Sequence, residues 1–271
     1  MGTQSSHPLH TNLYSEVRNF GESAAAPIVI SRLRETEEKP AKTALTWAES
    51  ATKRGFDLIA STIGVVALLP VLGLIAVCIK LTSSGPILFC QERIGKDQVP
   101  FKIYKFRTMY VLSEEQGPTV TRGCDDRMTN IGKFLRKFKL DELPQLFNVI
   151  QGNMSLVGPR PKLEKHERME MICKPGITGA ATLVFAREQI LLSQVPEEAF
   201  EDFTINVLNA IKAQIDTDYA RKSTFQSDMK LLIVTVAGSK FQKPITNLPE
   251  LLKKYGDTSL GLGRSTTFLG G

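Results

Sequence analysis

One long apolar stretch dominates the pattern of hydrophobic and polar positions. No charged residue occurs from Leu58 to Ile79, and about 20 apolar residues are enough for a helix to span a bilayer. Pro70 lies near the middle, where it removes a backbone hydrogen bond and kinks or breaks a helix. Lys53 precedes the stretch and Lys80 follows it, whereas a spanning helix carries its cation excess on one side. We therefore predict a re-entrant membrane helix that breaks at Pro70; a buried core helix and a transmembrane span are the alternatives.

Two shorter segments that follow favour β-structure. PILFCQERIG (residues 86–95) and PFKIYKFRTM (100–109) are rich in β-branched and aromatic residues, and only KDQV separates them. Runs of this kind with a short connection predict a β-hairpin.

The segment TNIGKFLRKF (129–138) predicts a short amphipathic helix. Its apolar residues recur at the i, i+3, i+4, i+7 spacing of one helix face. They are Ile131, Phe134, Leu135 and Phe138. Thr129 or Asn130 is the expected N-cap. Because the other faces are basic, the helix suits a membrane surface, although packing on a soluble core is equally compatible. Further helices are predicted over 196–222 and 225–238.

The charge distribution points to an anionic partner. The 271 residues include 34 Lys+Arg and 28 Asp+Glu, and 11 of the cations but only 5 acids lie from Arg93 to Lys139. Such a surplus favours nucleic acid, phosphorylated small molecules or anionic lipid as partners. The four Cys form no Cys-x-x-Cys pair, and two of the three His are in the first ten residues. A zinc site and a Ser/His/Asp triad are therefore not expected.

The candidate chemistry lies in KLDELPQLFNVIQGNMSLVGPRP, residues 139–161. Asp141 and Glu142 stand side by side between leucines, with cations before and after them. Carboxylates near several cations keep a low pKa, so we expect both to be ionised and able to hold a divalent cation together with a phosphate. Pro159 and Pro161 fix the backbone around Arg160, which aims that side chain, unless this is only a solvated loop. KPGITG (174–179) is expected to be a further Pro-Gly turn.

These motifs resemble the bacterial sugar transferase family. The resemblance rests on KRGFDLIAS, GPILFCQERIGKDQVPFKIYKFRTM, the segment from 125 to 161, and KPGITG, and it covers about residues 53–219. The family consists of monotopic phosphoglycosyl transferases that act on polyprenyl phosphate. The resemblance implies an enzyme that transfers a phosphosugar from a UDP-sugar to polyprenyl phosphate, releases UMP and requires Mg²⁺.

Carried over by position, the resemblance implies a role for each site residue. Asp141 is the expected nucleophile, which forms a covalent phosphosugar intermediate, and Glu142 is the expected Mg²⁺ ligand. The expected phosphate-binding cations are Lys105, Arg136 and Arg160. The break of the membrane helix falls on Pro70, which Leu69 precedes here in place of the family's usual Ser.

The predicted fold class is mostly α with a short β-hairpin, in a monotopic membrane protein. We expect a disordered polar tail over 1–44, the re-entrant helix over 45–82, a catalytic domain over 83–238 and a weakly ordered tail over 239–271. The resemblance implies the bacterial inner membrane, with the catalytic part on the cytoplasmic side.

A non-catalytic peripheral membrane protein that binds anionic lipid and recruits partners is the alternative function. A nucleic-acid-binding protein is a distant third, because the long apolar stretch has no use there. The sequence identifies neither the UDP-sugar nor the glycan pathway, and a homo-oligomer is left open.

Overall fold

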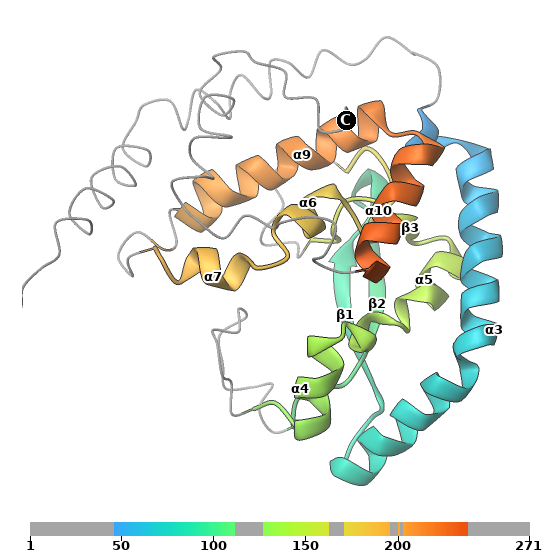
Figure 1. Cartoon of the computed structure of the whole chain (residues 1–271), viewed down its shortest axis with the longest axis vertical. Helices are drawn as coiled ribbons and strands as arrows, with labels where there is room; N and C mark the ends of the chain where they lie inside the picture. Colours follow the sequence, from blue (N-terminus) through green and yellow to red (C-terminus); the bar gives the residue numbers. More distant parts are fainter. Residues whose placement is uncertain (1–45, 112–126, 163–170, 196–199, 201–202, 238–271) are drawn as a thin grey trace, which may run out of the picture. The chain divides into compact units, whose positions relative to one another are not determined.

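The computed structural model describes residues 46–111, 127–162, 171–195, 200 and 203–237 (Figure 1). These residues belong to two compact units: a main unit of residues 46–183 and 216–237, and a second unit of residues 184–215. The described chain is mostly helical with a short β-hairpin, as predicted. The predicted tails at 1–44 and 239–271 lie outside the described residues.

The long apolar stretch forms most of helix α3, Ala51–Thr82, which follows the short η1, Trp47–Glu49. Ser50 caps α3 by accepting a hydrogen bond from the backbone N–H of Lys53. The helix continues through Pro70, so the structure does not confirm the expected break, and the re-entrant topology stays a prediction. Within the described residues, α3 is the one helix long and apolar enough to cross a membrane by length and composition.

The two halves of α3 bury different kinds of side chain in the main unit. Before Pro70 the buried residues are polar: Lys53, Asp57 and Ser61. After Pro70 they are apolar: Leu72, Ile75 and Ile79. The latter three form a core cluster with Phe106 and Leu135. Large apolar side chains remain exposed along the rest of the helix, namely Leu58, Ile59, Ile63, Val66, Leu69, Val71, Leu74, Val77 and Leu81.

The predicted hairpin is confirmed. Strand β1, Leu88–Ile94, pairs antiparallel with β2, Pro100–Phe106, across the short η2, Lys96–Gln98. Phe101 and Ile103 turn into a core cluster with Val149 and Met154.

Helices α4, Asn130–Lys137, and α5, Gln145–Gln151, flank the short η4, Leu140–Glu142. The Thr129 side chain accepts a hydrogen bond from the backbone N–H of Gly132, which confirms one of the two expected N-caps. Gly132 is required there because a Cβ would collide with the carbonyl oxygen of Thr108. Asn148 in α5 accepts from the backbone N–H of Tyr104 at 3.0 Å and donates to the carbonyl of Lys102 at 2.7 Å. These bonds fix α5 against β2.

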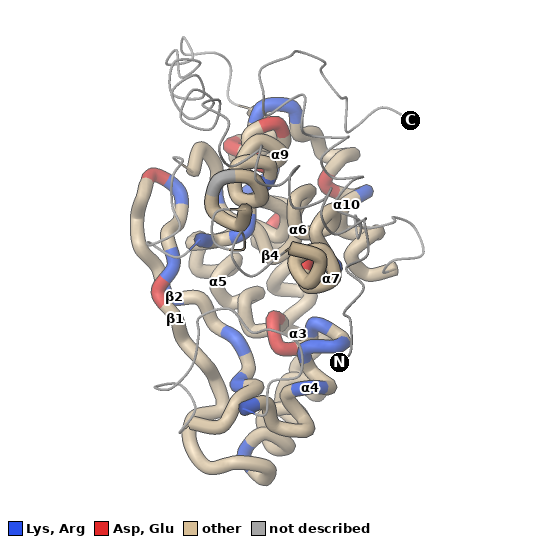
Figure 2. Tube along the Cα trace, turned by 90° about the vertical axis from the view of Figure 1, so that its left-hand side faces the viewer, with Lys and Arg blue, Asp and Glu red and all other residues tan. Residues whose placement is uncertain are grey.

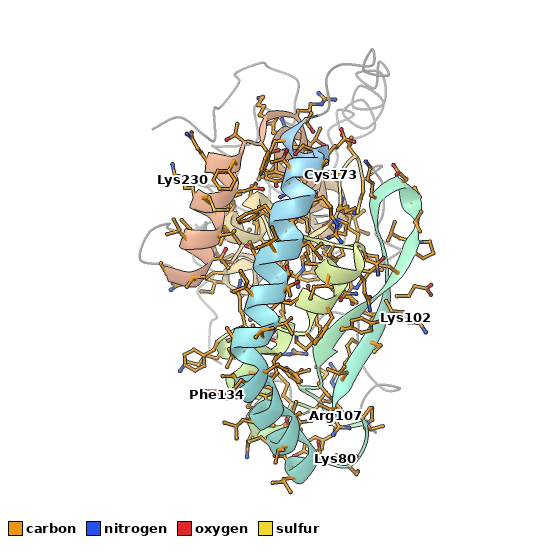
Figure 3. All side chains as sticks on the ribbon, turned by 90° about the vertical axis from the view of Figure 1, so that its right-hand side faces the viewer. Lys80, Lys102, Arg107, Phe134, Cys173 and Lys230 are labelled. Atoms are coloured by element: carbon orange, nitrogen blue, oxygen red, sulfur yellow. The ribbon has the colours of Figure 1, made fainter. Side chains whose placement is uncertain are left out.

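The expected apolar stripe of α4 divides into two parts. Leu135 is fully buried and Ile131 packs against the same core cluster, whereas Phe134 and Phe138 are 51% and 55% exposed. Their rings lie 4.9 Å apart, and Phe134 points outward from the helix (Figure 3). Part of the stripe therefore packs in the core, and part is exposed at the surface.

One expected turn is a strand. In KPGITG, residues Gly176–Thr178 form β4, which pairs in parallel with β3, Ser155–Val157. The prediction was wrong because Pro and Gly signal a local turn, while a parallel pairing depends on residues distant in sequence.

Helices complete the described chain: α6, Ala180–Val184; α7, Glu188–Leu192; η7, Phe203–Leu208, a π-helix; α9, Asn209–Lys222; and α10, Phe225–Ala237. The helix predicted over 196–222 is confirmed from residue 203 onward, because 196–199 and 201–202 lie outside the described residues. The predicted helix at 225–238 is confirmed through Ala237.

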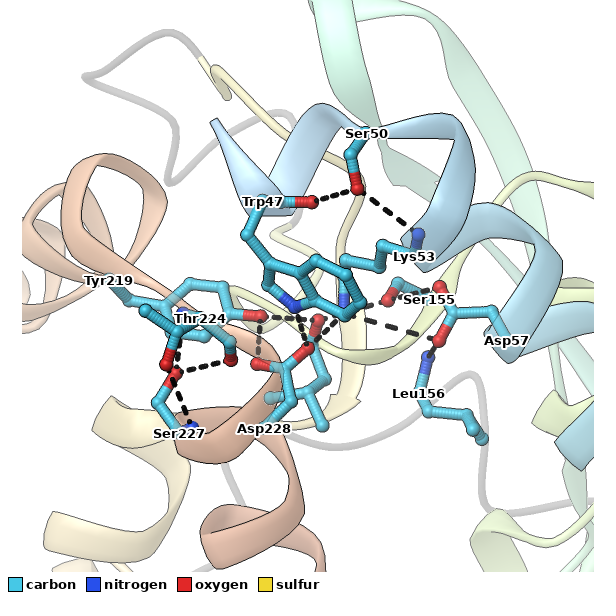
Figure 4. A network of polar contacts seen from close by, with 11 residues as sticks. Trp47, Ser50, Lys53, Asp57, Ser155, Leu156, Tyr219, Thr224, Ser227 and Asp228 are labelled. Atoms are coloured by element: carbon cyan, nitrogen blue, oxygen red, sulfur yellow. Dashed lines mark hydrogen bonds and ion pairs between the residues drawn. The ribbon is translucent and has the colours of Figure 1, made fainter. Parts of the chain in front are cut away.

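A buried polar cluster ties α3 to β3, α9 and α10 (Figure 4). We call it the anchor cluster, and its members are Trp47, Lys53, Asp57, Ser155, Tyr219 and Asp228. Lys53 Nζ contacts Asp228 Oδ2, to which Trp47 Nε1 also donates at 2.9 Å. Asp57 accepts hydrogen bonds from the Ser155 hydroxyl at 2.7 Å and from the backbone N–H of Leu156 at 3.2 Å.

Candidate active site

The two adjacent acids, Asp141 and Glu142, lie in η4, between α4 and α5. We call them the dyad. Lys139 begins this turn with φ 55° and ψ 23°, a left-handed conformation that few residues other than glycine adopt. Leu140 and Leu143 on either side of the acids pack against the core cluster of α3, β2 and α4. The backbone that carries Asp141 and Glu142 is therefore fixed from both sides. Basic and acidic segments lie next to one another beside α4 (Figure 2).

Glu142 is held by cations from two other parts of the chain. Lys105 Nζ, near the end of β2, donates to Glu142 Oε1 at 2.7 Å, and Arg160 Nη2 lies 3.6 Å from the same oxygen. Burial by itself raises the pKa of Glu142, but the charges of Lys105, Arg160 and Lys139 outweigh it and the pKa falls below its usual value. Glu142 is therefore ionised, as expected.

Asp141 differs from its neighbour. Burial and, after it, the charge of Glu142 raise the pKa of Asp141 above its usual value, against the opposing effect of Lys105 and Arg136. The expectation that both acids have low pKa values is thus wrong for Asp141, because a short sequence does not reveal desolvation. Within the described residues Asp141 forms no ion pair.

Arg136 lies in the last turn of α4. Its Nε donates to the hydroxyl of Thr108 at 3.0 Å, and its charge acts on Asp141. The structure therefore brings Lys105 and Arg160 directly to Glu142, while Arg136 interacts with the dyad only through its charge. The roles assigned to these five residues stay predictions.

The sequence analysis did not single out two residues of this region, Arg93 and Gln91. Arg93 in β1 donates from Nη2 to the side-chain oxygen of Gln91 at 2.5 Å. Burial and then the charge of Arg160 lower the pKa of Arg93 to about 10. The signal was available as strand alternation in FCQER, because residues two apart in a strand share a face.

Asp141 and Glu142 can bind Mg²⁺ only if water and substrate phosphates supply the remaining ligands. Within the described residues no group of three or more His, Cys, Asp or Glu side chains gathers to hold a metal. Mg²⁺ commonly binds one or two carboxylates together with water and substrate phosphates, which matches a dyad. The hydrogen bond from Lys105 falls on Oε1 of Glu142, and in the described part of the chain none is donated to Oε2.

Comparison with known proteins identifies the family of the chain. The model of the family described as bacterial sugar transferase matches residues 48–241. The chain belongs to this family. The match includes α3, the hairpin, the acids of η4 and the helices through α10.

Three relatives illustrate the range of the family. The undecaprenyl-phosphate glucose phosphotransferase of Komagataeibacter xylinus is 38% identical over 205 residues, covering 70% of this chain and 36% of that protein. The UDP-N-acetylgalactosamine-undecaprenyl-phosphate N-acetylgalactosaminephosphotransferase of Aeromonas hydrophila is 43% identical over 142 residues, covering 49% and 34%. The UDP-glucose:undecaprenyl-phosphate glucose-1-phosphate transferase of Caulobacter vibrioides is 36% identical over 196 residues, covering 68% of each chain.

The chain spans only about a third of the length of the first two relatives. The names of the relatives include both glucose and N-acetylgalactosamine. Membership in the bacterial sugar transferase family therefore does not identify the sugar.

Proposed function

We propose that this protein transfers a sugar phosphate from a UDP-sugar to polyprenyl phosphate and releases UMP. The observation that carries the proposal is the contrast within the dyad. Glu142 is held ionised by Lys105 and Arg160, whereas its neighbour Asp141 is desolvated and has a raised pKa. Pairs of acids whose environments separate their pKa values are typical of sites that divide two chemical roles. The relatives, named for transfer to undecaprenyl phosphate, support the same reaction.

The first step is attack by Asp141. A carboxylate oxygen of Asp141 forms a bond to the phosphorus that carries the sugar. The bond from this phosphorus to the oxygen that bridges the two phosphates breaks, and that oxygen leaves with UMP. Arg136 and Arg160 supply positive charge near the phosphates, which stabilises the charge that builds up on the departing group.

The second step returns the enzyme to its starting state. An oxygen of the polyprenyl phosphate attacks the same phosphorus, and the bond to the Asp141 carboxylate breaks. The products are a polyprenyl diphosphate sugar and the free carboxylate. Two successive steps at one site suit substrates of opposite solubility, because the nucleotide leaves before the lipid reacts.

Glu142 is the residue that would hold Mg²⁺, since its low pKa keeps it a ligand at neutral pH. When bound, the ion neutralises diphosphate charge. We expect activity to be lost in excess EDTA and restored by Mg²⁺, with Glu142→Gln shifting the Mg²⁺ requirement to higher concentration. Full activity of the wild type in excess EDTA would contradict a metal requirement.

Contacts at both ends of α3 support attachment to one membrane face. Lys53 is buried against Asp228 before Pro70, and Ile79 is buried against the core of the hairpin and α4 after it. One compact unit contacts both ends, which disfavours ends on opposite sides of a bilayer. The exposed apolar side chains of α3 and the exposed Phe134 offer surface for lipid. We therefore propose a monotopic protein of the bacterial inner membrane with its catalytic part on the cytoplasmic side.

The decisive experiment separates the two steps. The purified protein is incubated with a panel of radiolabelled UDP-sugars and Mg²⁺ without lipid, and UMP and protein-bound label are measured. We expect UMP release that matches the amount of enzyme, label on the peptide that contains Asp141, and transfer of that label when polyprenyl phosphate is added.

Two outcomes would contradict parts of this proposal. Transfer that requires both substrates together, with no labelled peptide, would exclude the covalent step but not the overall reaction. Binding to anionic vesicles without turnover of any UDP-sugar would favour a non-catalytic lipid-binding protein.

A further inference from the structure

The inner face of β1 carries two polar residues, Gln91 and Arg93. Phe89, Gln91 and Arg93 are partly buried, while the alternating residues of the strand through Glu92 are exposed. The strand register places Phe89 opposite Lys105, and directly paired residues project from the same face of a sheet. Gln91 and Arg93 therefore share the face from which Lys105 reaches Glu142.

The guanidinium of Arg93 is incompletely satisfied by the protein. Its Nη2 donates to the neutral oxygen of Gln91 at 2.5 Å. Its Nε is buried and has no hydrogen-bond partner, and in the described part of the chain no carboxylate forms an ion pair with it. A buried donor without an acceptor is costly, so this nitrogen is a candidate for contact with a ligand.

The end of β1 lies beside the segment that carries Arg160. The backbone N–H of Ile94, next to Arg93, donates to the carbonyl of Lys162 at 3.0 Å, and the side chain of Arg160 lies 3.6 Å from Glu142. The charge of Arg160 also contributes to the lowered pKa of Arg93. Two like charges near one another, one of them partly desolvated, are unfavourable unless an anion joins them. Arginine is suited to this role, because its planar group can donate two parallel hydrogen bonds to phosphate oxygens.

We propose that Arg93, oriented by Gln91, acts with Arg160 to bind the diphosphate of the sugar nucleotide. This inference rests on the proposed function. Arg160 lies 3.6 Å from Glu142, whereas among the described residues no ion pair or hydrogen bond joins Arg93 to either acid. We therefore assign Arg160 to the phosphate that Asp141 attacks and Arg93 to the phosphate that departs with uridine, and not to the phosphate of the lipid acceptor.

The test uses UDP as an unreactive probe. Calorimetric binding of UDP in Mg²⁺, inhibition of turnover by UDP, and KM for each substrate are measured for the full chain in detergent. For Arg93→Gln we expect UDP binding and inhibition to weaken by about 10- to 100-fold, the range for a lost charged hydrogen bond. The KM for the UDP-sugar rises, and the KM for polyprenyl phosphate is unchanged.

Three further variants serve as controls for the effect of Arg93→Gln on UDP binding. Lys102→Gln removes the same charge from the outer face of β2, where Lys102 points away from the hairpin (Figure 3), and we expect no change in UDP binding. Arg93→Lys keeps the charge without the planar group, so UDP binding should be intermediate. Gln91→Leu leaves Arg93 in place but removes its acceptor, and a smaller weakening is expected. Thermal unfolding shows whether Arg93→Gln folds. If it does not, Arg93→Lys and Gln91→Leu still test the role of Arg93 in UDP binding.

The outcomes separate this inference from the proposed function. Wild-type UDP affinity in Arg93→Gln, or a selective rise in KM for polyprenyl phosphate, overturns the inference even if the enzyme is a transferase. UDP binding that depends on Arg93 in a protein without transferase activity supports the nucleotide site and contradicts the proposed reaction. A wild-type protein that does not bind UDP overturns both.

Discussion

The anchor cluster and the dyad both combine neighbouring acids with lysine inside the main unit. In the anchor cluster, Lys53, Asp57 and Asp228 are each at most 3% exposed, and the two acids share one lysine with hydroxyl, indole and backbone donors. At the dyad, Asp141 and Glu142 are surrounded by Lys105, Arg136 and Arg160, and the side chain of Arg160 is 59% exposed. We call the latter five residues the dyad cluster.

The difference lies in what completes each cluster. The anchor cluster is completed by the protein: both oxygens of Asp228 and both oxygens of Asp57 accept contacts from side chains or backbone. The dyad cluster has more cations than acids, and Asp141 forms no ion pair within the described chain. A closed set of buried charges positions structural elements, whereas an open set with surplus positive charge is suited to an anionic substrate.

The largest expected effect comes from Asp141→Asn. This change removes the proposed nucleophile while preserving the shape of the side chain, so UMP release should fall at least about 10³-fold. Because the protein desolvates the charged form of Asp141, the neutral amide should not lower thermal stability. Rates and thermal unfolding are measured on the same preparation. A variant that loses activity only because it unfolds would assign Asp141 to structure instead.

Asp228→Ala should have the opposite profile. Lys53, Trp47 and Tyr219 all lose their common partner, and breaking a buried ion pair by removing one side costs about 3–5 kcal/mol. The free energy of unfolding, from denaturant titration, should drop accordingly. Asp218→Ala is the matched control: its ion pair with Lys222 is about half exposed, and such surface pairs contribute less than about 1 kcal/mol after solvent screening. Equal losses in the two variants would mean that the anchor cluster is energetically unimportant.

Sequence reasoning succeeded where the determining contacts are local. The hairpin of β1 and β2, the cap at Thr129, one of two expected, and the helix from Phe225 depend on residues close together in the sequence, and each was predicted. The dyad was found because its acids are adjacent and Arg160 is bracketed by prolines. All of these are short-range signals.

The missed features depend on contacts between distant residues. Lys53 and Asp228 are 175 positions apart, and neither residue type predicts burial. The expected turn at 174–179 contains strand β4 instead, because Gly176 pairs with Ser155 of β3. The raised pKa of Asp141 and the lowered pKa of Arg93, to which the charge of Arg160 contributes, likewise follow from packing. A family resemblance suggests roles for particular residues, but their desolvation and strand register follow only from the folded chain.

The pH dependence should also distinguish the two acids of the dyad. In the proposed reaction Asp141 attacks as a carboxylate, and burial and then the charge of Glu142 raise its pKa above the usual value. Turnover should therefore decrease as pH falls through this raised pKa, by about tenfold per pH unit below it. Initial rates at saturating substrate concentrations, measured over a range of acidic pH values, test this decrease in turnover.

The same shift makes a prediction for stability, with a defined sign. A folded-state pKa above the unfolded value means that ionised Asp141 destabilises the fold at higher pH. Asp141→Asn should thus unfold at a higher temperature than wild type near neutral pH, and the difference should vanish below the unfolded pKa of an aspartate. Glu142, whose pKa is lowered, contributes stability above its unfolded pKa and loses it as pH falls through the folded value. A stability difference between wild type and Asp141→Asn that grows at acidic pH would show that the assigned direction for Asp141 is wrong.

The smallest expected effect tests how tightly the anchor cluster is coupled. The Tyr219 hydroxyl lies 2.8 Å from Asp228 Oδ1 and 3.0 Å from the carbonyl of Val157, and it has one proton to donate. Tyr219→Phe removes that bond but keeps the buried ring, so the free energy of unfolding should fall by about 1 kcal/mol. Tyr104→Phe serves as the control, since the Tyr104 hydroxyl forms no hydrogen bond among the described residues. If the cluster acts as a unit, Tyr219→Phe should cost less in an Asp228→Ala background than in wild type, because the shared acceptor is already gone. UMP release should be unchanged in Tyr219→Phe at temperatures below unfolding; a specific loss of turnover there would mean that the anchor cluster participates in the reaction and that the contrast between the two clusters does not hold.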